Sequence, residues 1–112
     1  MDGCAKLAAI RERVERGPTI LRAAEEVSVF RELQGVPYEE VVRCHRDFDE
    51  ITSALYMSHM DTYFEVNDSN IRPFLDFADW LEGLGEHVGG TAQTSLHELA
   101  EHFRANSKNF KL

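Results

Sequence analysis

The feature that most constrains the fold is a long stretch, residues 38–72, that contains neither glycine nor proline. Apolar residues recur in it three and four positions apart, the spacing of one face of an α-helix. They are Val41, Cys44, Phe48, Ile51 and Leu55, followed by Tyr56, Met60 and Tyr63. The pattern predicts one helix over residues 37–64, closed by the polar turn at 67–70. At 1.5 Å per residue this helix would be about 40 Å long.

That length is large for a chain of 112 residues, whose radius of gyration should be about 13 Å. We therefore expect the helix either to break near Ser58 or to project from the body. A projecting apolar end would need to be covered by a second chain, which is the argument for a homodimer or a bound partner.

Glycine and proline divide the rest of the chain into shorter helices. The predicted helices span residues 4–16, 19–34, 71–87 and 94–106. A Gly-Pro pair at 17–18 separates the first two, and a Gly-Gly pair at 89–90 predicts a flexible joint before the last. Ser95 and Glu98 form a capping-box pattern for that last helix. No alternating strand pattern is present, so we predict an all-α bundle of four to five helices with one long central helix, in a single domain over residues 1–112.

The charge is strongly acidic and unevenly distributed. The formal net charge is -8, and residues 47–101 hold twelve acidic residues and one basic residue, Arg72. Such a field repels nucleic-acid phosphates and anionic lipid headgroups, so neither direct nucleic-acid binding nor membrane binding is expected. It would steer a basic partner surface toward the chain, or it keeps a small protein in solution.

The cysteine content predicts an intracellular protein. Cys4 and Cys44 are too few for the dense disulfide framework of a small secreted domain, and neither belongs to a CxxC motif. We expect two free thiols, with Cys44 packed as a small apolar residue. Charged residues interrupt any leader-like apolar run, and no apolar stretch approaches the roughly 20 residues needed to cross a bilayer. A cytoplasmic location is therefore predicted.

A search for chemistry-bearing motifs predicts no catalytic, cofactor-binding or metal site. His97 and His102 resemble the two histidines of the zinc-protease motif, but they are five residues apart and thus about 140° apart around a helix. The pairs His97–Glu101 and Glu98–His102 have instead the i,i+4 spacing that stabilises a helix surface. No histidine has a glutamate three residues before it, as a di-iron bundle needs, and no phosphate-binding glycine loop is present. The chain is therefore predicted not to be an enzyme.

The candidate partner-binding residues lie at the end of the long predicted helix. They are Leu55, Tyr56, Met57, Met60, Tyr63 and Phe64. Aromatic residues and methionine are enriched at interface centres, although an apolar stripe of this kind can also be core. Trp80 is added to the set because acidic residues surround it in sequence. It is either an anchor for a basic partner or a half-buried edge residue.

These observations predict a non-enzymatic regulatory protein that binds and inhibits a protein partner. The alternative is an acidic DNA mimic or anti-CRISPR-type inhibitor of a nucleic-acid-binding protein. In size, helical content and acidity, most of all over residues 36–64, the chain resembles the small bacterial anti-activators of quorum-sensing regulators of the QslA type. The resemblance implies binding to a LuxR-type transcription activator and disruption of that activator's dimer.

Overall fold

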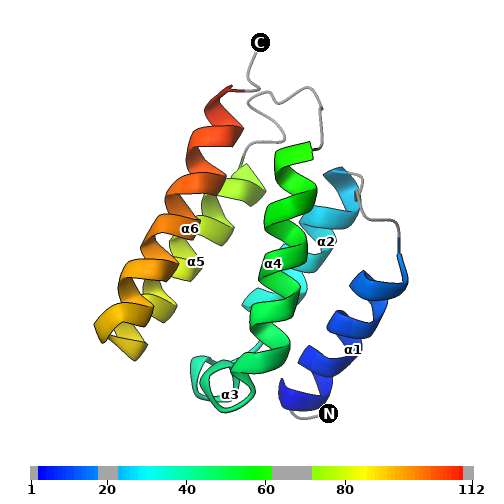
Figure 1. Cartoon of the computed structure of the whole chain (residues 1–112), viewed down its shortest axis with the longest axis vertical. Coiled ribbons are helices and arrows are strands. Elements are labelled where there is room, and N and C mark those ends of the chain that lie inside the picture. The colour runs from blue at the N-terminus through cyan, green and yellow to red at the C-terminus, as the bar shows by residue number, and fades with distance from the viewer. Residues whose placement is uncertain (1–2, 18–22, 62–71, 110–112) are drawn as a thin grey trace. The chain divides into compact units, whose positions relative to one another are not determined.

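The computed structural model describes residues 3–17, 23–61 and 72–109, and all their regular secondary structure is α-helical (Figure 1). The all-α prediction is confirmed. Six helices are described where four to five were predicted. The chain divides into two units, residues 1–62 and residues 63–112.

Four helices form the first unit. They are α1 (Gly3–Arg16), α2 (Ala23–Gln34), α3 (Tyr38–Arg43) and α4 (His45–Asp61). Helix α1 lies against α4 and α3, and an ion pair between Arg13 and Glu32 joins it to α2. The apolar side chains buried in this unit are Leu7, Ile10, Val14, Val29, Phe30, Leu33, Val36, Val41, Phe48, Ile51 and Leu55. The three-and-four spacing read from the sequence of α1 therefore marks its buried face.

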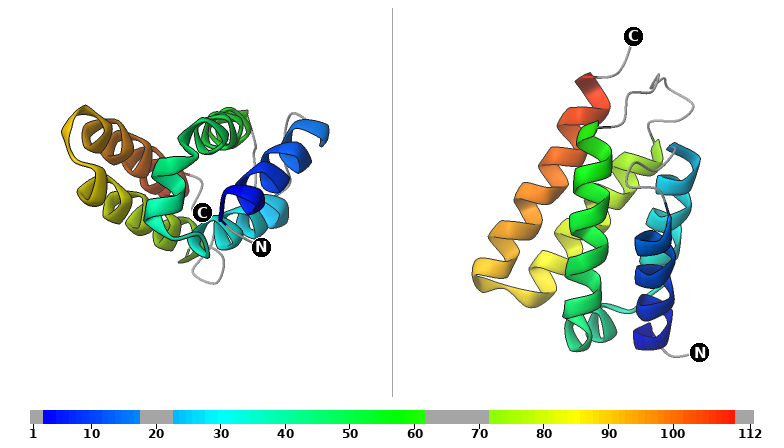
Figure 2. Two further views of the ribbon diagram at one scale, coloured as in Figure 1. Left: turned by 90° about the horizontal axis from the view of Figure 1, so that it is seen from below. Right: turned by 45° about the vertical axis from the view of Figure 1, so that its right-hand side comes forward.

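The prediction of one long helix over residues 37–64 is wrong, because the helix is interrupted at Cys44. Helix α3 ends at Arg43, Cys44 has non-helical dihedral angles (φ -116°, ψ 42°), and α4 begins at the next residue. Helix α3 turns away from the axis of α4 (Figure 1, Figure 2). The remaining α4 has 17 residues, about 25 Å, and it continues past the break expected near Ser58. The length of the helix therefore no longer supports a homodimer.

A disulfide bond between Cys4 and Cys44 corrects the prediction of two free thiols. The two residues are 40 positions apart in sequence, but the fold brings their Cα atoms to 5.7 Å, within the range that a disulfide spans. The bond joins the first turn of α1 to the α3–α4 junction. Since disulfides persist mainly in oxidising compartments, cysteine content no longer supports the cytoplasmic prediction.

Ion pairs to one arginine also join α1 to α4. The Nε atom of Arg11 lies 2.8 Å from Asp47, and its Nη1 atom lies 3.4 Å from Glu50 and 3.5 Å from Glu15. Asp47 and Glu50 lie in the first two turns of α4, close to the disulfide in sequence. The start of α4 is thus attached to α1 both covalently and electrostatically.

The second unit is an antiparallel hairpin of α5 (Arg72–Val88) and α6 (Gly90–Asn109) (Figure 1). Gly89 and Gly90 have φ angles of 74° and 63°, a left-handed conformation that glycine adopts without a side-chain clash. Because these two residues reverse the chain, α6 begins at Gly90 and not at 94 or 95. Ser95 therefore lies inside the helix, and its predicted capping box with Glu98 is wrong.

The hairpin buries the stripe that the sequence of α5 predicts. Its buried apolar side chains are Phe74, Phe77, Ala78, Leu81, Leu84, Ala100 and Phe103. The rings of Phe77 and Phe103 meet edge to face, with centroids 5.4 Å apart. Among the described helices of both units, none has the length and apolar character to cross a bilayer.

Candidate functional site

The structure separates the candidate residues of α4 into core and surface. Leu55 is completely buried, so it belongs to the core of the first unit, whereas Tyr56 is 37% exposed and Met57 is 56% exposed. Met60 lies on α4, but its side chain is outside the described part, and Tyr63 and Phe64 lie outside the described residues. We call Tyr56 and Met57 the Tyr56–Met57 surface.

The helical period explains this separation. Phe48, Ile51 and Leu55 are three and four residues apart, and all three are buried. Successive residues on a helix are about 100° apart, so Met57 is about 200° from Leu55 and points away from the core. Within the candidate segment, Leu55 is therefore buried, whereas Tyr56 and Met57 are exposed.

Trp80 is a half-buried residue at the edge of the second unit's core. Its ring stacks on Phe77, with centroids 5.9 Å apart and an interplanar angle of 14°. The acidic residues around it have partners in the chain: Asp76 pairs with Arg72 at 2.9 Å, and Asp79 pairs with Arg104.

Arg104 is the centre of a charged cluster between α5 and α6. Its Nη1 donates to Glu82 at 2.8 Å and to Glu101 at 2.7 Å, while its Nη2 donates to Asp79 at 2.6 Å and to Glu82 at 2.9 Å. The arginine side chain is only 18% exposed. Hydrogen bonds to Glu82 and then to Asp79 raise the pKa of Arg104, and the hydrogen bond from Arg104 lowers the pKa of Glu82.

Three members of this region have the donor atoms of a metal site. A nitrogen of His97 lies 2.9 Å from Glu82, and potential ligand atoms of Glu82, His97 and Glu101 all lie within 4.8 Å of one another. The guanidinium of Arg104, however, already contacts both carboxylates, and a cation would have to displace it. The arrangement is that of an ion-pair network that holds two helices together.

The sequence pattern identified part of this cluster. It paired His97 with Glu101 by their i,i+4 spacing but missed Glu82 and Arg104 as partners. Their contacts join residues 22 positions apart on two helices, and no local spacing encodes such a contact. The Gly-Gly pair at 89–90, which the sequence analysis interpreted as a flexible joint, was the available signal, because a tight turn there places α5 against α6.

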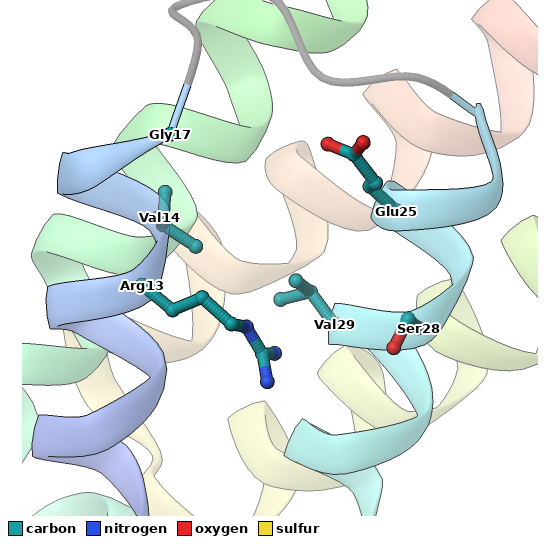
Figure 3. A pocket seen from close by; sticks show the side chains of 6 residues that line it. All are labelled: Arg13, Val14, Gly17, Glu25, Ser28 and Val29. Carbon is teal, nitrogen blue, oxygen red and sulfur yellow. The ribbon is translucent and has the colours of Figure 1, made fainter.

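A pocket in the first unit lies between α1 and α2 (Figure 3). It has a volume of about 340 Å³ and is lined by Arg13, Val14, Gly17, Glu25, Ser28 and Val29. Val14 and Val29 face the space between the helices, and Arg13 extends from α1 toward α2. Arg13 is paired with Glu32, while Glu25 and Ser28 are exposed. The pocket thus has a small apolar floor but no set of convergent polar groups that would orient a ligand.

The chain matches no protein-family model, no curated protein and no solved structure. The resemblance to QslA-type anti-activators therefore stays a prediction, and any function has to be argued from the residues and their geometry.

Proposed function

We propose that this chain is a non-enzymatic regulatory protein that binds a protein partner by apolar contact at the Tyr56–Met57 surface of α4. The observation that carries the proposal is the 56% exposure of Met57, the largest among the exposed large apolar side chains of the described residues. Methionine is flexible and polarisable, and tyrosine combines an apolar ring with a polar tip. Both properties suit a side chain that exchanges water for a partner.

The charged residues favour this proposal over the DNA mimic. Among the acidic residues of the span 47–101 whose side chains the structure describes, six form ion pairs with arginines of the same chain. They are Asp47 and Glu50 with Arg11, Asp76 with Arg72, and Asp79, Glu82 and Glu101 with Arg104. A carboxylate that replaces a nucleic-acid phosphate must be available to the partner's basic residues. These six carboxylates are instead paired within the chain.

From the resemblance over residues 36–64 we propose, more specifically, that the chain is an anti-activator that binds a LuxR-type transcription activator and disrupts that activator's dimer. A homodimer through α4 would bury the same Tyr56–Met57 surface, and sedimentation of the isolated chain distinguishes the two cases. In both cases the contact is apolar and involves neither a cofactor nor nucleic acid.

Salt dependence of a captured complex tests the proposal. The full chain would be immobilised, exposed to an extract of the host that encodes it, and washed with rising salt up to 1 M. At that concentration the Debye length is about 3 Å, so exposed charge pairs are screened while apolar contacts persist. We expect a specific partner to be retained at 1 M salt. Release of every captured protein at moderate salt would favour the acidic mimic and contradict the proposal.

A further inference from the structure

The break at Cys44 has no local cause in the sequence. Neither glycine nor proline occurs near it, and the usual i,i+4 backbone hydrogen bonds are present on both sides. The amide of Cys44 donates to the carbonyl of Glu40 at 3.0 Å, and the amide of Phe48 donates to the carbonyl of Cys44 at 3.5 Å. Helical bonding therefore reaches Cys44 from both directions, but the bonds that would bridge the junction, from the amides of His45 and Asp47 to the carbonyls of Val41 and Arg43, are not formed. The dihedral angles of Cys44 also depart from the helix.

Cys44 is also the residue through which the junction is bonded to α1. Its disulfide partner, Cys4, lies in the first turn of α1, and Arg11 of the same helix pairs with Asp47 just beyond the junction. Both cysteines are half-buried, so a reductant has partial access to the bond. The covalent attachment thus acts at the one non-helical residue between α3 and α4.

A continuous helix would keep the buried residues on one side. Val41 and Phe48 are 2% and 4% exposed, and they are seven residues apart, about 20° from alignment on a helix. Joining α3 to α4 would therefore place the two side chains on the same side of the continuous helix. The seven-residue spacing is compatible with the bent and with the continuous arrangement.

We propose that the Cys4–Cys44 disulfide is a redox-sensitive brace that keeps α3 and α4 as separate helices, and that its reduction joins them into one helix through Cys44. The reductant is a dithiol, whose first thiolate attacks one sulfur of the disulfide. A mixed disulfide forms, and the other cysteine leaves as a thiolate and takes up a proton. The second thiol of the reductant then displaces the remaining cysteine, so two electrons and two protons pass to the protein and the reductant becomes a disulfide.

The joined helix would change one exposed surface. Val42 on α3 is 41% exposed, and it is fourteen residues before Tyr56, two heptads along a continuous helix. On such a helix the two side chains would lie about 21 Å apart and within about 40° of each other. Reduction would therefore place Val42 in line with the Tyr56–Met57 surface.

Nuclear magnetic resonance of the isotopically labelled full chain tests the proposal without any partner. Spectra would be recorded before and after addition of dithiothreitol, with the cysteine Cβ shifts reporting the state of the bond. We expect the Cα shift of Cys44 to move to a helical value on reduction. We also expect the amide of Phe48 to exchange with solvent at least about tenfold more slowly, because its hydrogen bond becomes part of a continuous helix.

Cys4→Ser supplies the matched control, because it leaves Cys44 in place and prevents the bond. This variant should show the helical shift of Cys44 without reductant, and dithiothreitol should then change nothing. A Cys44 that stays non-helical in both the reduced protein and Cys4→Ser would overturn the proposal. Loss of the helical signals of α1 and α3 on reduction would also overturn it, because the bond would then be required for the fold.

Discussion

Removal of the disulfide should lower the free energy of unfolding by about 4 kcal/mol. The bond joins Cys4 to Cys44 across a sequence separation of 40. In the chain-entropy account a cross-link stabilises the fold by restricting the unfolded chain, with about 3 kcal/mol for a loop of 15 residues and about 4.7 for one of 100. A loop of this length gives a value of about 4 kcal/mol. Since small domains have a free energy of unfolding of about 5–15 kcal/mol, the chain without the bond should stay folded but be less stable.

Urea unfolding followed by far-ultraviolet circular dichroism measures this difference. The oxidised protein would be compared with Cys4→Ser, Cys44→Ser and the double variant, all under the same buffer conditions. Each single variant should match the double variant, because either change removes the bond. Dithiothreitol should destabilise the unmodified protein alone. A loss below about 1 kcal/mol in all three variants would refute the reasoning, since a bond that closes so long a loop cannot be nearly neutral on this account.

Three further perturbations test the second unit. Arg104→Ala should lower the unfolding free energy by about 1–2 kcal/mol because it removes the guanidinium group that pairs with three carboxylates, of which Glu82 keeps its contact with His97. Arg16→Ala, which breaks one i,i+4 pair at 79% exposure, should cost less than about 0.5 kcal/mol, and equal losses in urea titrations would contradict this. The pKa of Glu82 is lower when folded than when unfolded, so its stabilisation is present above the unfolded value and is lost as the pH falls through the folded one. Unfolding free energy measured against pH should therefore fall on acidification, less steeply in Glu82→Gln, and identical slopes would count against the Arg104 contact. Gly89→Ala, at a φ of 74°, should lower the free energy of unfolding by about 1 kcal/mol, seen as a reduced melting temperature, and an unchanged melting temperature would show that the turn tolerates a side chain.

Local spacing predicted the helices whose ends and buried faces are set by nearby residues. The stripe of Leu7, Ile10 and Val14 in α1 is buried as the pattern indicates, and α5 begins and ends within one residue of its predicted bounds. The buried face of each of these two helices follows from the spacing of its own apolar residues. Nothing distant has to be known for either.

The remaining features depend on contacts between residues far apart in sequence. The break at Cys44 coincides with a bond to a residue 40 positions earlier, and the network of Arg104 needs Glu82 from the other helix. The start of α6 was misplaced for a different reason. Two glycines in the left-handed conformation reverse the chain directly, where sequence reasoning expected a longer joint.

The candidate residues on the long predicted helix, unlike Trp80, were predicted as one segment, and of those whose side chains the structure describes two are exposed. Periodicity identified the apolar residues of α4 correctly but could not assign a side to each, because the predicted stripe was wider than one helical face. Leu55 and Met57 illustrate the difference, with exposures of 0% and 56% two residues apart. Whether such a side chain is exposed depends on how the other helices pack around it, and the spacing of residues in one sequence does not determine that packing.

Equilibrium binding of the captured partner tests whether Met57 and Tyr56 form the apolar contact with a protein partner. Titration calorimetry would compare the unmodified chain with Met57→Ser and Tyr56→Ser, and with Ser53→Ala as a matched exposed control on α4. A contact at the centre of an interface is worth about 2 kcal/mol or more, which is roughly a thirtyfold loss of affinity. We predict that loss for Met57→Ser, with unchanged helical content and unchanged binding by Ser53→Ala. Affinities within twofold of the unmodified chain for both Met57→Ser and Tyr56→Ser would contradict the claim.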